Sequence, residues 1–190
     1  MNVDVVMPKD NEKELIELAE KLGFKEIIFL YDDLQKKLPK PKLTSKQLSS
    51  KKIKIYTAGL INNIKEVDKA KNNFDFVFAP AQRKFFENKK IKYLINAESS
   101  AREDFLYQRR AGLDDVMCRL AKEKDKVIVF NIKLLEQNKN LLARMMQNAK
   151  LCRKYKVKTL VATLAFNPLE MRAAKDLQGF ARTLGLYLSC

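Results

Sequence analysis

The chain has 190 residues, carries 38 lysines and arginines against 23 acidic residues, and contains no histidine, so its formal net charge is +15. Without histidine, Ser/His and Cys/His catalytic pairs are excluded, and the commonest metal ligand of proteins is missing. The apolar runs are far shorter than the roughly 20 residues of a membrane helix, the N-terminus lacks the pattern of a secretion signal, and the cysteines form no CxxC motif. We therefore expect a cytoplasmic protein with no membrane partner.

Short β-rich runs alternate with helical patterns along the chain. The predicted strands are residues 3–7, 26–31, 53–58, 74–79, 91–95, 127–132 and 159–163. Several are apolar on both faces, as in a parallel sheet that is covered on both sides. This alternation leaves two α/β architectures, an open doubly wound sheet or a small barrel. Because an eight-unit barrel typically needs about 250 residues, a compact, incomplete TIM-like (β/α) barrel with about seven parallel strands agrees better with the count.

Apolar residues at helical spacing predict the main helices between these strands. The predicted helices are residues 11–22, 113–121, 141–155 and 167–184. Gly23 and Gly185 follow the first and the last of them as stop signals. Asn167 and Pro168 supply a cap and a first-turn proline, so we expect the last helix to begin there.

The positive charge is concentrated in two windows that contain no acidic residue. One window lies between Asp33 and Glu66 and holds nine lysines. The other lies between Glu136 and Glu170 and holds seven lysines and arginines. Positive charge that is segregated in this way indicates a polyanionic partner.

Residues 35–52 stand apart from the predicted elements. The stretch is polar and rich in lysine, contains two prolines and has no apolar periodicity. We interpret it as an exposed basic loop within a single domain that spans residues 1–190. It is either a solvated linker or a flexible arm that grips phosphates, for instance through Lys36 and Lys37.

In β/α barrels, catalytic groups follow the C-terminal ends of the strands. Two acids, Asp32 and Asp33, follow the second predicted strand. Such a pair either holds Mg²⁺ weakly by oxygen ligation or forms a turn or a helix cap. The five glycines form no phosphate-binding loop, and the pattern contains no hydrolase active site.

The segment 108–121, with the sequence QRRAGLDDVMCRLA, differs in kind from the rest of the chain. It places Arg109 and Arg110 before a glycine-punctuated turn, two acids and a helix. The arginines either pair locally with Asp114 or Asp115, or point outward to an RNA backbone. In the second case their planar guanidinium groups would match the phosphate oxygens.

Three segments carry a recognisable family pattern: RRAGLDDVMCRLAKEKDKVIVFNIKLL, LLARMMQNAKLCRKYKV and EMRAAKDLQGFARTLGL. Together they resemble the barrel-shaped protein subunit of ribonuclease P found in archaea and eukaryotes, the protein component 3 family. The resemblance is strong over residues 109–186 and weaker, but in register, over residues 2–31.

The resemblance implies a PHP-like barrel that serves as a noncatalytic RNA-binding subunit of ribonuclease P. It would support the RNA-catalysed removal of the 5′ leader from precursor tRNA and have no activity of its own. The implied partners are ribonuclease P RNA, a small α/β protein subunit in a heterodimer or heterotetramer, and precursor tRNA indirectly. The chain itself would bind no cofactor or metal, whereas the RNA of the holoenzyme needs Mg²⁺.

Charge and resemblance together give the residues that we expect to bind RNA. These are Lys36, Lys37, Arg109, Arg110, Arg119, Lys122, Lys150, Arg153, Lys154 and Arg172. The resemblance also places Gly112, Asp114 and Asp176 on structural motif positions. Arg172 and Asp176 are one helical turn apart, so an intrahelical ion pair is the alternative role for this arginine.

The chain departs from the wider PHP pattern at residues 4–8. PHP phosphoesterase-type barrels, to which the family is related, carry a D-x-H-x-H metal motif on the first strand, whereas this chain has DVVMP. The aspartate remains and both histidines are missing, which excludes the ancestral metal site. Two other functions stay open: a metal-dependent phosphoesterase that uses Asp4, Asp32 and other carboxylates, and a generic basic RNA-binding barrel.

Overall fold

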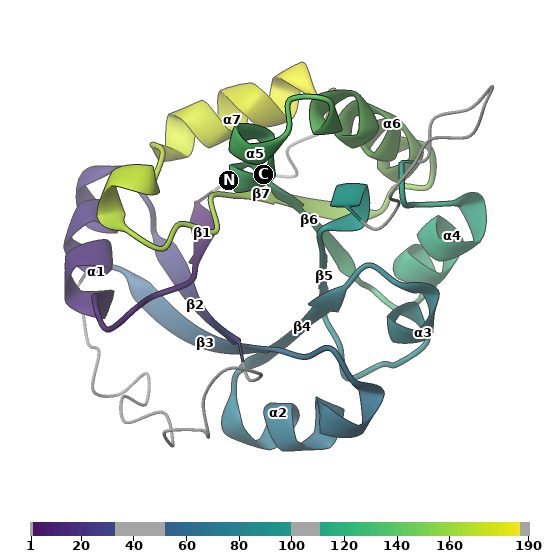
Figure 1. The fold of residues 1–190 in the computed structure, drawn as a ribbon, viewed down its shortest axis with the longest axis horizontal. Coiled ribbons are helices and arrows are strands. Elements are labelled where there is room, and N and C mark those ends of the chain that lie inside the picture. Colours follow the sequence, from purple (N-terminus) through teal and green to yellow (C-terminus); the bar gives the residue numbers. More distant parts are fainter. Residues whose placement is uncertain (1, 33–51, 100–110, 187–190) are drawn as a thin grey trace.

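The computed structural model describes residues 2–32, 52–99 and 111–186, in which the strands form a ring and the helices lie outside it (Figure 1). Seven parallel strands follow one another around the ring in chain order. They are β1 (Val3–Val6), β2 (Glu26–Asp32), β3 (Lys54–Leu60), β4 (Phe76–Pro80), β5 (Tyr93–Ile95), β6 (Val127–Asn131) and β7 (Lys158–Ala162). The predicted α/β TIM-like barrel of seven parallel strands is therefore confirmed.

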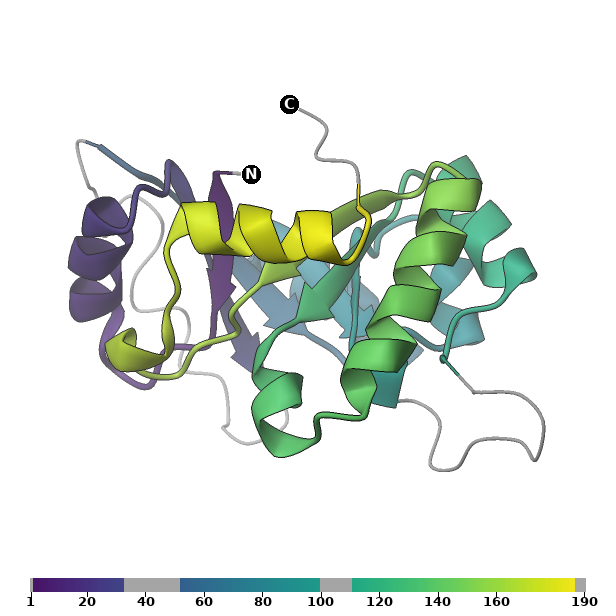
Figure 2. The ribbon, with the colours of Figure 1, turned by 90° about the horizontal axis from the view of Figure 1, so that it is seen from above.

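Helices connect the strands on the outside of the ring (Figures 1 and 2). The α-helices are α1 (Glu12–Lys21), α2 (Val67–Asn73), α3 (Arg83–Phe86), α4 (Asp115–Glu123), α5 (Lys133–Gln137), α6 (Leu141–Lys154) and α7 (Ala174–Thr183). Three short 3-10 helices are η1 (Ile64–Glu66), η2 (Ala97–Ser99) and η3 (Pro168–Glu170). Within the described ranges, no helix has both the length and the apolar character needed to cross a membrane.

Alternation along the strands divides the core into two layers. On β1, Val5 packs inside the ring, and Val6 packs outside it against the helices. The inner layer consists of Val5, Ile28, Leu30, Ala58, Phe78, Ile95, Val129, Leu160, Ala162 and Leu164. Because these apolar side chains fill the interior, the barrel is a packed core and not a pore.

The first and last strands meet at a seam that contains little strand pairing. The seam has one isolated parallel bridge, between Val6 and Ala165. Two backbone hydrogen bonds accompany it: the N–H of Met7 donates to the carbonyl of Ala165 at 2.8 Å, and the N–H of Leu164 donates to the carbonyl of Val5 at 2.9 Å. Side chains therefore have a larger part in closing the ring here than between the other strands.

The last helix begins later than the sequence predicts. Pro168 opens the 3-10 helix η3, and the backbone is extended at Met171 and Ala173 before α7 starts at Ala174. The side chain of Met171 is buried in the outer core, and the N–H of Ala174 donates to the carbonyl of Leu22 at 3.1 Å. These tertiary contacts hold the extended segment, so the expectation of one helix from residue 167 is wrong.

Candidate nucleic-acid interface

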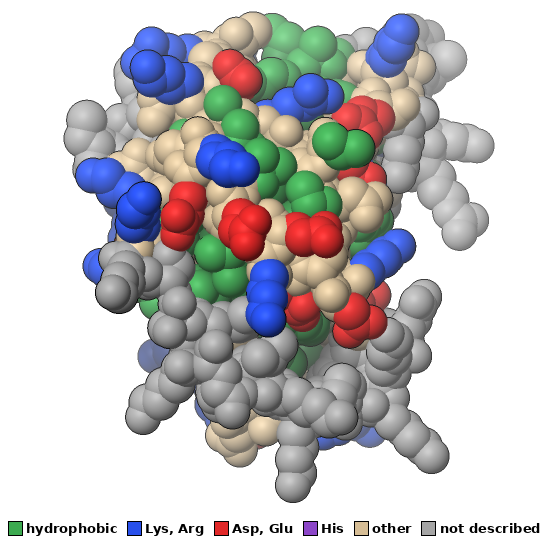
Figure 3. All heavy atoms as spheres, turned by 90° about the vertical axis from the view of Figure 1, so that its left-hand side faces the viewer, with side chains coloured by type: hydrophobic (Ala, Val, Ile, Leu, Met, Phe, Trp, Pro, Cys, Tyr) green, Lys and Arg blue, Asp and Glu red, His purple; other side chains and the backbone are tan. Residues whose placement is uncertain are grey.

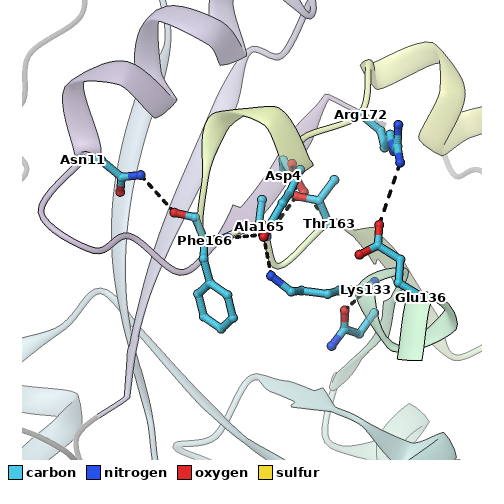
Figure 4. Close-up of polar contacts among 10 residues, drawn as sticks. Asp4, Asn11, Lys133, Glu136, Thr163, Ala165, Phe166 and Arg172 are labelled. Carbon is cyan, nitrogen blue, oxygen red and sulfur yellow. Dashed lines mark hydrogen bonds and ion pairs between the residues drawn. The ribbon is translucent and has the colours of Figure 1, made fainter. Parts of the chain in front are cut away.

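The C-terminal end of the barrel, where β/α barrels carry their active sites, is held by a local polar network (Figure 4). The side-chain amide of Asn131 donates to Asn96 at 3.1 Å, and its oxygen accepts from the N–H of Lys133 at 3.0 Å. The Lys133 ammonium pairs with Glu170 and lies 3.8 Å from the centre of the Phe166 ring. Each of these groups already has a partner within the chain.

Asp4, the first residue of the DVVMP segment, faces away from the barrel interior. It alternates with Val5, which packs inside, and its carboxylate accepts hydrogen bonds from the N–H and the hydroxyl of Thr163 at 2.9 and 2.7 Å. The N–H of Val5 donates to the same carboxylate at 2.8 Å. Burial raises the pKa of Asp4 to about 6, and the hydrogen bonds from Thr163 and Val5 oppose that rise. The carboxylate thus helps to close the seam.

The second aspartate of the phosphoesterase hypothesis is far from the first. Asp4 lies opposite Ile27 in the register of β1 and β2, and Asp32 lies five residues further along β2. At about 3.3 Å per residue, this separates the two by about 16 Å along the strand. In the part of the chain that the structure describes, no group of three or more His, Cys, Asp or Glu residues could hold a metal ion.

Two of the residues expected to bind RNA gather around one aromatic ring between α4 and α6. Tyr155, directly after α6, is half-buried against the outer core. The Arg119 guanidinium of α4 lies 5.7 Å from the centre of its ring, and the Lys154 ammonium of α6 lies 5.0 Å from it. Lys154 also pairs with Asp115 at 3.7 Å, and both Tyr155 and Asp115 raise the pKa of the lysine. Tyr155 was not among the predicted site residues.

Three further expected residues lie on the same two helices. Lys122 is exposed in the last turn of α4, and Lys150 is exposed one turn before Lys154 on α6. The guanidinium of Arg153 donates to the carbonyl of Gly185 at 3.4 Å and remains exposed. We call the surface formed by Arg119, Lys122, Lys150, Arg153, Lys154 and Tyr155 the α4–α6 basic face. Its exposed cations are suited to bind phosphates, and its ring is suited to contact a sugar or a base.

Arg172 lies apart from the α4–α6 basic face. It precedes α7 and pairs with Glu136 of α5 at 3.8 Å (Figure 4). The alternative of an intrahelical ion pair between Arg172 and Asp176 is therefore wrong, because the extended segment before α7 keeps Arg172 out of the helix. Asp176 is exposed in the first turn of α7.

The motif positions before α4 have defined backbone roles. Asp114 caps the helix, because its carboxylate accepts the N–H of Met117 at 2.6 Å. Gly112 has a φ of 99°, a left-handed conformation that glycine adopts without strain. Asp115 pairs with Lys154 of α6, and the suggested local pairs with Arg109 or Arg110 lie outside the described residues.

A buried polar cluster, which the sequence did not predict, fixes this turn to α6. The side-chain amide of Asn148 donates to the carbonyl of Ala111 at 2.7 Å and to the carboxyl group of Glu98 at 3.3 Å. Its oxygen accepts the N–H of Leu113 at 3.3 Å. Burial raises the pKa of Glu98 to about 7. The signal in the sequence was a lone asparagine on the apolar stripe of a helix.

Four of the residues expected to bind RNA lie outside the described residues. They are Lys36, Lys37, Arg109 and Arg110. The same is true of nearly all of the basic loop at 35–52, of which only Lys52 is described. The assignments for these residues therefore stay predictions.

The side of the molecule formed by α1 has a different charge. This helix carries Glu12, Glu14, Glu17 and Glu20 against two lysines. Figure 3 shows acidic side chains across the middle of that side, with basic ones around them. The positive charge of the chain is therefore unevenly distributed in space as well as in sequence.

The comparisons with known proteins agree on the architecture. No protein-family model matches the chain, and no curated protein matches it. Among solved structures, it is similar to a chain of the cryo-EM structure of archaeal ribonuclease P with mature tRNA, with a TM-score of 0.74, 22% identity, and coverage of 97% of this chain and 83% of that one. It is also similar to histidinol phosphate phosphatase from Lactococcus lactis, in complex with zinc, L-histidinol and phosphate, with a TM-score of 0.62, 14% identity, and coverage of 98% and 94%. At these identities the similarity establishes the shared barrel fold.

Proposed function

We propose that the chain is a noncatalytic, RNA-binding protein subunit of ribonuclease P that supports the RNA-catalysed removal of the 5′ leader from precursor tRNA. The observation that carries the proposal is the similarity over 97% of the chain to a chain of archaeal ribonuclease P. The family pattern in residues 109–186 points the same way. Its direct partners would be ribonuclease P RNA and a small α/β protein subunit, in a heterodimer or heterotetramer, with precursor tRNA as an indirect partner.

The charges of the α4–α6 basic face support an RNA-holding role. Arg119, Lys122 and Lys150 are exposed, and cations of this kind position a protein on phosphates without reading sequence. The chain itself would need no cofactor, and Mg²⁺ would act with the RNA of the holoenzyme. The site of action would be the cytoplasm.

Reconstitution tests this proposal. Ribonuclease P RNA and the partner proteins are assembled with and without this chain, and cleavage of precursor tRNA is measured over a range of Mg²⁺ concentrations. Omission of the chain is expected to raise the Mg²⁺ concentration needed for half-maximal cleavage. An unchanged Mg²⁺ requirement would remove the subunit assignment.

Salt dependence gives an independent measurement. If phosphate contacts dominate, the logarithm of the affinity for RNA falls with the logarithm of the salt concentration by about 0.9 per contact on a duplex and about 0.7 on a single strand. A flat response would contradict the proposed role.

The phosphoesterase alternative has its own test. The purified chain is incubated with Mn²⁺ or Mg²⁺ and a chromogenic phosphate ester. Because Asp4 is buried against Thr163 and distant from Asp32 along β2, we expect no turnover. Turnover that Asp4→Asn abolishes would favour the alternative.

A further inference from the structure

The segments that lead into the strands bring lysines from distant parts of the sequence to the N-terminal edge of the barrel. A lysine precedes or begins five of the seven strands, namely β2, β3, β5, β6 and β7. These lysines are Lys25, Lys54, Lys92, Lys126 and Lys158, of which Lys126 is buried, and Lys124 and Lys156 lie close to them in the sequence. In Figure 2, β1 enters from the upper side, where the N-terminus is marked, and parallel strands all enter from that side. The parallel order therefore gathers the lysines on one edge.

Both edges of the barrel carry both signs of charge, since Glu26 and Asp125 lie among the lysines of the entry edge. Among the described residues that follow the strands, Lys133 pairs with Glu170, and Arg172 pairs with Glu136. Asp32 ends β2 there as an exposed acid. In the part of the chain that the structure describes, the entry edge is thus the more basic of the two.

Aromatic rings occupy the mouth that this lysine edge surrounds. Tyr56, Phe76 and Tyr93 point inward near the starts of β3, β4 and β5 and pack on the inner core. The ring centres of Tyr56 and Phe76 are 5.3 Å apart, and so are those of Phe76 and Tyr93. Tyr93 also stacks on the fully buried Phe78 at 4.5 Å. The chain of contacts holds the three rings together in the mouth.

The exposed part of these rings opens out of the barrel at its N-terminal mouth. Tyr56, Phe76 and Tyr93 are half-buried, whereas the next inward side chains along β3 and β4, Ala58 and Phe78, are fully buried. Among the described residues, the exposure of these inward side chains therefore lies toward the side at which the strands begin. Burial, Glu26 and Tyr56 all raise the pKa of the Tyr93 hydroxyl, which keeps this ring neutral.

Two lysines at the starts of β3 and β7 lie on the inward face of their strands, as the rings do. Lys54 lies two residues before Tyr56 on the same inward face of β3, and Lys158 begins the inward face of β7. Their side chains are 74% and 59% exposed. Lys54 lies 3.9 Å from Glu26, and Lys158 lies 2.7 Å from Asp125. Such exposed pairs contribute little to stability, so a polyanion can compete for the amines at low cost.

We infer that the N-terminal mouth of the barrel binds single-stranded RNA, with an unpaired base against Tyr56, Phe76 and Tyr93 and the adjoining phosphates on Lys54 and Lys158. This inference rests on the proposed function and names a second RNA contact, separate from the α4–α6 basic face. Aromatic rings inside a positively charged rim are the arrangement by which proteins bind single strands without reading sequence.

The recessed position of the rings selects for single strands. Bases within a duplex are stacked on one another and cannot enter a mouth to reach an aromatic floor, whereas unpaired bases can be splayed out. An acidic peptide would engage the lysines and leave the rings unused. The contribution of the rings therefore separates RNA from other polyanions.

The test measures binding of a labelled oligouridylate of about 12 nucleotides, a length within the range of known single-strand sites, to the intact chain by fluorescence anisotropy at several salt concentrations. The rim variant is K54Q/K158Q, and the ring variant is Y56L/Y93L. The control is K13Q/K65Q, which removes the same charge from exposed positions in α1 and η1. A fourth variant, K122Q/K150Q, reports on the α4–α6 basic face, and circular dichroism confirms the fold of each.

The rim variant is expected to bind about tenfold more weakly, with the log–log salt slope reduced by about 1.4, because each single-strand phosphate contact contributes about 0.7. The ring variant is expected to lose about tenfold in affinity with an unchanged slope, because it removes stacking and no charge. The control is expected to bind within about twofold of the parent chain at the same salt.

Three outcomes overturn the inference. In the first, K122Q/K150Q binds more weakly while the rim and ring variants bind like the parent chain. This result would contradict the inference about the mouth and leave the proposed RNA-binding function standing. A loss in the rim variant alone would mean that the mouth attracts any polyanion. A loss in the control as large as that in the rim variant would mean that only net charge matters. If the ring variant fails to fold, Y56L alone replaces it.

Discussion

Asp4 and Thr163 join the first and last strands of the barrel through a side chain. One carboxylate oxygen of Asp4 accepts the N–H of Thr163 at 2.9 Å, and the other accepts its hydroxyl at 2.7 Å. This aspartate thus has a structural partner within the chain. It also brings a buried titratable group into the seam.

The seam makes stability depend on pH. Since burial raises the pKa of Asp4 from its ordinary value of 3.8 to about 6, the folded protein holds this proton more tightly than the unfolded chain. The free energy of unfolding therefore falls as the pH rises from about 4 to about 6, by up to about 3 kcal/mol. Glu98, whose pKa is raised to about 7, adds a fall that ends about one pH unit higher.

Asp4→Asn isolates the contribution of the seam. Asparagine can accept the Thr163 N–H and donate to its hydroxyl, as the protonated acid does, so the variant is expected to match the parent near pH 4 and to be more stable near pH 7. Urea denaturation at several pH values measures the difference. Equal pH profiles for the two proteins would show that Asp4 does not titrate in this window.

Gly59→Ala is expected to destabilise the barrel by about 1–3 kcal/mol through overpacking. A Cβ atom at Gly59 would lie 2.7 and 2.9 Å from two ring carbons of Phe74, which is buried and stacked on Tyr31. The control is Gly179→Ala in α7, where a Cβ atom meets nothing within 4 Å. It is expected to stabilise by about 0.5–1 kcal/mol, because alanine favours a helix over glycine. Denaturant unfolding that gives both changes the same sign would refute this account.

Asn148→Ala is expected to cost about 3 kcal/mol. It removes the hydrogen bonds to Ala111, Leu113 and Glu98 and leaves buried backbone groups without these partners. The control is Met146→Ala on the same helix, whose side chain is 49% exposed, with an expected effect within about 0.5 kcal/mol. Urea denaturation at one pH compares the two. Similar losses would show that α6 tolerates both changes alike and that Asn148 has no special role.

The α4–α6 basic face gives a prediction about RNA affinity. R119Q/K154Q removes the two cations beside Tyr155 and is expected to weaken binding to ribonuclease P RNA about tenfold, with a flatter salt dependence. Filter binding at two salt concentrations measures both effects. K13Q/K65Q again serves as the charge-matched control, and an equal loss in the control would contradict a local role for this face.

Asp125→Asn should strengthen RNA binding at the N-terminal mouth about threefold. Asp125 pairs with Lys92 at 2.5 Å and with Lys158 at 2.7 Å, and these two lysines lower its pKa to about 2. Its removal leaves both amines free for phosphates. Asparagine also tolerates the φ of 50° at this position, so the fold is retained. Weaker oligouridylate binding by the variant in the anisotropy assay would contradict the placement of RNA at these lysines.

The strands could be predicted from the sequence because their apolar, β-branched side chains favour a strand whatever their tertiary contacts. Runs such as residues 127–130 are apolar on both faces and mostly β-branched, which is typical of a parallel sheet that is covered on both sides. The start of α7 could not be predicted, because Pro168 is equally acceptable in a 3-10 turn. The buried side chain of Met171 and the hydrogen bond from Ala174 to Leu22 decide the matter, and both are tertiary contacts.

The candidate sites show the same limit. The acid-free windows drew attention to α6, but such a window is seen in the sequence alone, whereas a charged face depends on how the fold brings distant residues together. Lys25, Lys54, Lys92 and Lys158 are far apart along the chain, and the parallel order of strands brings them to one edge. Likewise, the spacing of Arg172 and Asp176 suggested an ion pair that the extended backbone before α7 prevents.

The sparse seam between β1 and β7 has a consequence for synthesis on the ribosome. The other strand pairs join strands that follow one another in the chain, but Asp4 and Thr163 are 159 positions apart in the sequence. While only the first six strands have emerged, the sheet is open, and β1 and β6 are unpaired edges of the kind that recruit other chains. Closure must await the emergence of residues 158–165. During most of its translation, the nascent chain therefore exposes an unpaired strand edge that can pair with other chains, and the finished barrel no longer has this edge.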